Sequence, residues 1–246
     1  MFIKIDLLQL KKNIILLIAI CSGFGLSAQR SLIQNWSYLD TKPYNFGFLL
    51  GINQMDFGIQ MKDSYKLNDT LYGIRSEGRP GFTVGALANL KLHEYWDLRS
   101  GVIFSFGARD LIYYMHENPN RGIEQIRKNI ESTTLDIPLE LKFRGMRNRS
   151  LRPFVIGGFR YSRDMASNAK KRQQNEDDYV VKLHRDDFFF TTGAGFDFYL
   201  PYGNRIGIEI KMAFGMRDIL IRENNIFTNG IDRLMSRNLQ IAINIE

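Results

Sequence analysis

The side chains able to perform acid–base or nucleophilic chemistry are few and far apart in this sequence. The chain of 246 residues has three histidines, His93, His116 and His184, and one cysteine, Cys21. Acyl transfer by a serine needs a histidine that activates it and a carboxylate that orients the histidine. Ser105 falls in a predicted strand, whereas the histidines fall in predicted turns and loops. The sequence therefore predicts no enzyme and no catalytic residue.

A metal site is the second kind of chemistry to consider. In the stretch "HRDD", the side chains of His184, Asp186 and Asp187 could ligate a cation. The pattern is too short to be specific, because structural metal sites need several ligands at set spacings. We therefore predict neither a metal nor a cofactor.

Charged side chains at alternate positions carry more information. In "LDIPLELKFR", residues 135–144, the odd positions are apolar and the even ones are charged, with Pro138 as the exception. Period two is typical of a β-strand, because successive side chains leave opposite faces. Pro138 cannot donate to a sheet ladder, so it predicts either a local bulge or a weak seam where a partner docks.

Seven more segments show the same period, and each is near the 9 to 11 residues that cross a bilayer when tilted. The eight predicted strands cover residues 46–53, 81–92, 96–107, 135–144, 152–162, 190–200, 205–216 and 238–246. The segments between them alternate long, short, long, short, long, short, long. This order is typical of outer-membrane barrels, which have long outer loops and short periplasmic turns. We predict an all-β fold, an eight-stranded antiparallel transmembrane β-barrel.

The glycines and the charges decide which face is inside. They share the face opposite the apolar band, and small residues there leave room for long charged ones in a lumen that side chains can fill. A soluble lipocalin-like barrel would have to bury these charges or expose about eight bands of apolar side chains to water. The predicted lumen charges, which should pair with one another, are Asp97, Arg99, Asp136, Glu140, Lys142, Asp197, Glu209 and Lys211.

The amino terminus predicts export. Lys11 and Lys12 precede an apolar run that ends in small residues at Ala28, the pattern of a secretory signal peptide. The expected organisation is a signal peptide over 1–28, a periplasmic segment over 29–43 and an outer-membrane barrel over 44–246. The mature chain would then lack cysteine, because Cys21 lies in the signal. The net charge of +7 is scattered and does not predict nucleic-acid binding.

The strand motifs resemble a known family. "LDIPLELKFR", "RPFVIGGFRYS" and "GAGFDFYL" look like the small outer-membrane barrels of Bacteroidetes, and "FGFLLGINQMDF" with the ending "SRNLQIAINIE" is similar to their PorT family. The resemblance covers nearly the whole mature chain. It implies a non-enzymatic accessory or assembly role in type IX protein secretion and gliding motility, with outer-membrane lipid and other secretion subunits as partners. The family usually carries a terminal aromatic residue, and this chain ends in Ile245 and Glu246.

Two alternatives remain open: a generic OmpX-like structural or adhesion barrel, and a lipid A-modifying enzyme. One short turn is also unusually basic. Four arginines within nine residues have no acidic neighbour in the sequence, and such a patch could attract an acidic partner or extend toward lipid headgroups. The predicted periplasmic partner contact consists of Arg144, Arg147, Arg149 and Arg152.

Overall fold

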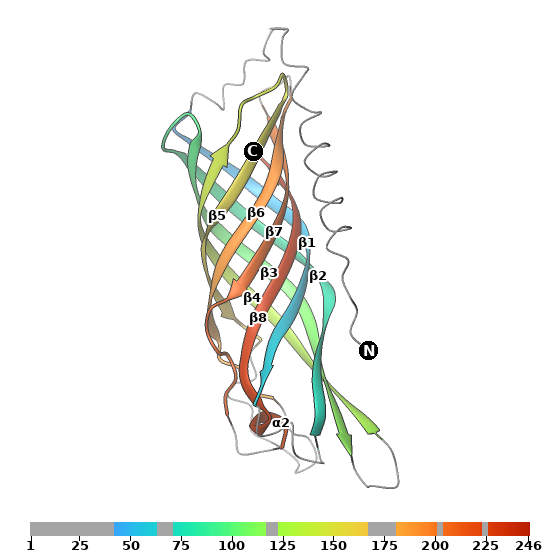
Figure 1. The fold of residues 1–246 in the computed structure, drawn as a ribbon. Helices are drawn as coiled ribbons and strands as arrows, with labels where there is room; N and C mark the ends of the chain where they lie inside the picture. Colours follow the sequence, from blue (N-terminus) through green and yellow to red (C-terminus); the bar gives the residue numbers. More distant parts are fainter. Residues whose placement is uncertain (1–41, 63–70, 117–122, 167–180, 201–203, 223–225) are drawn as a thin grey trace, which may run out of the picture. The chain divides into compact units, whose positions relative to one another are not determined.

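The fold is a closed ring of eight antiparallel strands (Figure 1). The structure is a computed structural model that describes residues 42–62, 71–116, 123–166, 181–200, 204–222 and 226–246. The predicted all-β barrel is confirmed. Each strand pairs with its neighbours in the chain, and β8 closes the ring on β1. The elements are β1 (Tyr44–Met61), β2 (Leu71–Lys91), β3 (Trp96–His116), β4 (Ile123–Arg144), β5 (Leu151–Asp164), β6 (Asp186–Tyr199), β7 (Arg205–Gly215), the short helix α2 (Ile226–Asn229) and β8 (Ile231–Ile245).

Seven of the eight strands are longer than the sequence predicted, and three of them are much longer than β7. β2, β3 and β4 have 21, 21 and 22 residues, whereas β7 has 11. Pairing of β1 with β2 stops at Met55 and Arg79, and pairing of β4 with β5 starts at Thr134 and Asp164. Beyond these points β3 still pairs with both neighbours. A three-stranded sheet therefore extends past the ring at the end where α2 lies (Figure 1). We call it the outer sheet: residues 71–78, 109–116 and 123–133.

An apolar band surrounds the ring and marks the membrane-spanning part. Large apolar side chains such as Phe48, Phe104 and Ile210 point outward and are about half exposed. Aromatic pairs lie at both borders of the band: Trp96 and Phe143 near the short turns, with ring centroids 4.9 Å apart, and the pairs Phe82–Phe106, Phe159–Phe190 and Tyr161–Phe188 toward the outer sheet. Two aromatic girdles are typical of outer-membrane barrels.

A β-bulge lies where β2 leaves the ring. Gly78 pairs with Arg109 and Phe82 pairs with Phe106, so β2 contains one extra residue between these pairs. At Gly81 a Cβ atom would lie only 1.9 Å from the carbonyl oxygen of Phe106, which requires glycine. Because an extra residue reverses the alternation of faces, Ile74 in the outer part of β2 points inward rather than outward.

Pro138 interrupts one ladder without a bulge. Arg99 lies opposite Glu140 and Ile103 lies opposite Asp136, so one register continues on both sides of a two-residue gap in the β3–β4 pairing. The pyrrolidine ring is buried on the lumen side. The prediction of a bulge at Pro138 is therefore wrong. The proline does not lie on the lipid-facing surface.

The outer end of the lumen is closed by an apolar cluster, which we call the outer plug. Strand residues supply most of it, and two loop segments complete it where Leu183 and Leu220 form a β-bridge. Its buried members are Phe57, Leu111, Tyr113, Ile130, Val181, Leu183, Ile219, Leu220, Ile231 and Leu234. In the described part of the chain, no helix is long and apolar enough to cross a membrane.

Candidate functional site: the charged lumen

The lumen of the ring is lined by charged side chains from strands β3 to β7. The structure places all eight predicted lumen residues inside the ring, each with at most 5% of its surface exposed. Their alternation on the strands positions them there, because outward neighbours are apolar and lie in the lipid-facing band. Burial of a charge is costly unless it is paired and hydrogen-bonded, so the contacts of these groups decide whether the fold is stable.

The middle of the lumen holds six of the eight. Lys142 Nζ lies 2.7 Å from Asp197 Oδ2. Arg99 Nη1 lies 2.6 Å from Glu209 Oε2, although the two residues are 110 positions apart in the chain. Lys211 Nζ bridges Glu209 at 3.0 Å and Glu140 at 3.6 Å. The pairing expected for Arg99 and Lys211 is thus present across the lumen.

The periplasmic end of the lumen holds ion pairs that the sequence did not predict. Asp97 forms an ion pair with Arg144, whose Nη2 lies 2.9 Å from Asp97 Oδ1. Glu246, the last residue, inserts its side chain into the lumen and pairs with Arg205 and, at 3.8 Å, with Arg99. Gly47 leaves the space for it, because a Cβ there would lie 2.5 Å from Glu246 Cγ. The side chain of Glu246 therefore contributes a charge to the lumen.

Two members of the predicted partner contact are in the wrong place for that role. Arg144 is 1% exposed and Arg152 is 6% exposed. Both side chains point into the lumen, where each donates to the backbone oxygen of Glu94 in the neighbouring turn. They tie two periplasmic turns together and cannot present charge to a partner. Of the four arginines, only Arg149 is exposed and Arg147 half-buried. Their place in the alternation could have identified them. Arg144 lies two residues after the inward-facing Lys142, and Arg152 lies two residues before the inward-facing Phe154.

The outer third of the lumen is held by hydroxyl groups and arginines. Asp136 accepts hydrogen bonds from Ser105 at 3.0 Å and Ser162 at 2.5 Å, and it lies 3.4 Å from Arg160. Arg109 stacks over the ring of Phe57, which belongs to the outer plug, and donates to Ser132 and Ser236. The sequence did not predict Arg160 as a lumen residue. Its strand has apolar residues on both faces, so the alternation does not show which face is inside.

The buried lumen charges of the described residues balance in sign. The basic members are Arg99, Arg109, Lys142, Arg144, Arg152, Arg160, Arg205 and Lys211. The acidic members are Asp97, Asp136, Glu140, Asp164, Asp187, Asp197, Glu209 and Glu246. Eight of each sign leave no net charge in this part of the lumen. Equal numbers of opposite charges suit a packed interior in which they pair.

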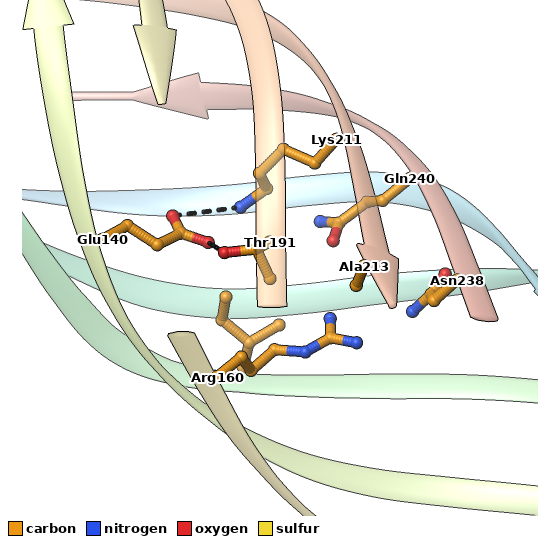
Figure 2. Close-up of a pocket in the computed structure, with 8 residues that line it drawn as sticks. Glu140, Arg160, Thr191, Lys211, Ala213, Asn238 and Gln240 are labelled. Atoms are coloured by element: carbon orange, nitrogen blue, oxygen red, sulfur yellow. Dashed lines mark hydrogen bonds and ion pairs between the residues drawn. The ribbon is translucent and has the colours of Figure 1, made fainter. Parts of the chain in front are cut away.

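Little space remains among these groups. A cavity of about 10 Å³, which is roughly the space of one water molecule, lies beside Glu140 and Lys211. Figure 2 shows Glu140 contacting both Thr191 and Lys211, with Arg160, Asn238 and Gln240 around the same space. Asn238 Oδ1 and Gln240 Nε2 have no hydrogen-bond partner among the described residues. Because buried polar groups are almost always hydrogen-bonded, we expect a bound water here.

The residues considered for catalysis or metal binding do not meet. Ser105 is buried and donates to Asp136, while His93 and His184 are exposed at opposite ends of the barrel. Asp186 points outward to the Tyr161 hydroxyl at 2.6 Å, whereas the adjacent Asp187 points into the lumen. Across the described ranges, no group of three or more histidine, cysteine, aspartate or glutamate residues could hold a metal ion.

Outside the membrane-spanning part, Asp218 organises the segment before β8. Burial alone would raise the pKa of Asp218, but the backbone N–H groups of Leu234 and Leu220 and the guanidinium of Arg222 donate to its carboxylate. These bonds favour the charged form and hold the pKa below its ordinary value. Asp218 thereby fixes the loop that carries Ile219 and Leu220 into the outer plug.

The model of one known protein family matches most of the chain. No curated protein sequence matches the chain. Among solved structures, it is similar to Neisserial surface protein A (8% identity, TM-score 0.41, 83% of this chain and 99% of that one) and to OprG from Pseudomonas aeruginosa (14%, 0.44, 81% and 93%). It is also similar to Ail of Yersinia pestis (13%, 0.37, 83% and 99%). The model of the outer membrane protein beta-barrel domain matches residues 28–220. The chain therefore belongs to the family of outer membrane protein β-barrel domains and is located in the outer membrane.

Proposed function

We propose that this protein is a non-enzymatic outer-membrane barrel that acts as an accessory or assembly component of type IX protein secretion. The observation that carries the proposal of an accessory role, rather than of transport through the barrel, is the lumen. Paired charges fill it, the outer plug closes it, and its buried charges sum to zero. A barrel filled in this way is not a route for a polypeptide or a solute, so it must act through its outer surfaces.

The secretion role itself rests on the resemblance of the first strand and of the carboxyl end to the PorT family. Such a component would work beside other subunits in the same membrane. The decisive experiment is to delete the gene and to measure export of proteins that carry a type IX carboxy-terminal signal. We expect export to fall and to recover when the wild-type gene is restored. Normal export in the deletion strain would refute the secretion role.

The second candidate is a structural or adhesion barrel, and the outer sheet favours it. Among the described strands, the outer part of β4 pairs with β3, and its pairing with β5 begins only at Thr134 and Asp164. The edge of a sheet is a template for pairing with another extended chain. In the same deletion strain, normal export together with reduced attachment to surfaces or to other cells would favour this candidate. A changed lipid A mass spectrum would instead indicate the lipid-modifying enzyme.

A further inference from the structure

A groove on the lipid-facing surface stands out from the apolar band around it. It has a volume of about 470 Å³ and lies over β5, β6 and β7 in the periplasmic half of the barrel. Ala194 pairs with Val155 on one side and with Ile210 on the other, so a one-carbon side chain lies between two branched ones. Phe196 and Pro153 border the groove toward the periplasm. The small side chain of Ala194 adds depth to the groove at this point.

The chemistry of the groove suits a hydrocarbon chain. The side chains that point outward into it are all apolar, and the surface is one that the family places in the outer membrane. In a bilayer such a surface is covered by lipid. A groove differs from the flat surface around it because an acyl chain in it gains contacts on three sides.

The basic turn lies at the periplasmic border of the same groove. Gly145 at the start of the turn hydrogen-bonds to the carbonyl oxygen of Pro153, a wall residue, at 2.8 Å. At the tip, Arg149 is exposed and only four residues before Pro153, about 13 Å of extended chain. A cationic group at this level of the membrane lies where phospholipid phosphates are found, and arginine binds phosphate well.

The backbone of Arg149 is strained. Its φ of 56° places it in the left-handed region, where it is the only described residue other than glycine. Glycine would adopt this conformation without strain, whereas a residue with a Cβ pays a conformational penalty. Arg147 supports the arrangement, because its Nε donates to the Arg149 carbonyl at 2.8 Å and its guanidinium stacks over Tyr199. The strained position thus carries an exposed arginine in the turn that borders the groove.

We propose that the groove and the turn bind one phospholipid of the periplasmic leaflet, with an acyl chain over Ala194 and the phosphate at Arg149. The assignment does not depend on the secretion role. It differs from general solvation by lipid because both parts of one molecule are held by fixed residues.

The test is native mass spectrometry of the full mature barrel, refolded in detergent and incubated with phosphatidylglycerol. We expect the wild type to retain one lipid. A194L should fill the groove and lower retention at least tenfold, and A86L, which adds the same side chain to the lipid-facing side of β2, should leave it unchanged. R149Q should lower retention about fivefold, the equivalent of the roughly 1 kcal/mol that an arginine contributes at a membrane surface, whereas R217Q at the outer end should not.

R149G separates binding from folding. Glycine relieves the strain, so the barrel should be at least as resistant to urea as the wild type, yet it should lose lipid as R149Q does. R149K should retain lipid, and inorganic phosphate should not displace it, because phosphate lacks the chain. Equal retention in wild type, A194L and R149Q would overturn the proposal. Reduced cargo export in R149Q with unchanged lipid retention would overturn it in favour of a protein partner at this turn.

Discussion

The ring and the outer sheet bury opposite kinds of side chain. Within the ring, charges such as Lys142 and Asp197 are inside and apolar side chains face lipid. In the outer sheet and the loops above it, Leu111 and Leu220 are inside, and charged side chains of the outer-sheet strands are outside. The difference shows that one strand pattern serves two solvents: lipid favours apolar side chains on the outer surface, and water favours them in the core.

The change occurs within single strands. On β3, Arg99 and Leu111 both point inward, one among ion pairs and the other in the outer plug. On β2 the bulge at Gly81 keeps Ile74 on the inner side, where it packs against the plug. The position at which the inner face changes from polar to apolar is therefore also the position at which the barrel leaves the membrane.

The largest effect should come from an ion pair in the ring. K142M leaves Asp197 buried without its main partner, and we expect the free energy of unfolding to fall by about 3–5 kcal/mol. Urea titration in lipid vesicles, followed by heat-modifiable gel mobility, measures it. In the double variant K142M/D197N the buried charge is gone as well, and most of the loss should be recovered. A double variant as unstable as K142M would mean that packing, not charge, is the cause.

In the outer plug, the free energy of unfolding should depend on the packing of apolar side chains rather than on charge. L234A removes most of a fully buried side chain and leaves a cavity, so unfolding should become easier by about 2–5 kcal/mol. The same urea titration applies. Leu139 faces lipid and is 56% exposed, so L139A should cost less, because lipid fills the space and no cavity forms. Equal losses for the two variants would contradict the description of the outer end as a packed core.

Asp218 allows a test by pH of how the loop closes the plug. D218N weakens the hydrogen bonds to Leu220 and Leu234, and we expect a local loss of about 1.5 kcal/mol, measured as faster hydrogen exchange at these two amides. Because the folded pKa is lowered, the advantage of the wild type over D218N should be complete above pH 3.8, its ordinary pKa, and should disappear as the pH falls through the lower folded value. An advantage that persisted in strong acid would exclude the carboxylate as its source.

The smallest effect should come from an ion pair on the outer face of the outer sheet. Arg127 contacts Glu77 and Asp110 at 3.2 Å, but about half of its side chain is exposed. Water screens such a pair, so R127M should change the free energy of unfolding by less than about 1 kcal/mol. The comparison with K142M, the same kind of substitution in the ring, is the direct measure of how differently the two regions use charge. A loss as large as that of K142M would break the distinction.

The sequence alone determined the eight strands of the ring and the inner face of most of them. Period two identifies which side chains share a face, and the concentration of glycine with Asp97, Glu140 and Lys211 indicated the polar side. The sequence predicts loops for the outer parts of β2, β3 and β4. The structure extends the strands there, and inward side chains such as Leu111 and Ile130 are apolar where the ring has polar ones.

Only the tertiary structure decided the partners of the charges. Ring closure brings β3 opposite β7, so that Arg99 meets Glu209, and it brings the carboxyl terminus beside Arg205. It also places Arg144 and Arg152 inside the lumen, where the sequence alone predicted an exposed patch. Periodicity in a sequence records the face on which a side chain lies, because that depends on the local backbone. The partner across a lumen depends on curvature, register and the position of every other strand, which no single segment contains.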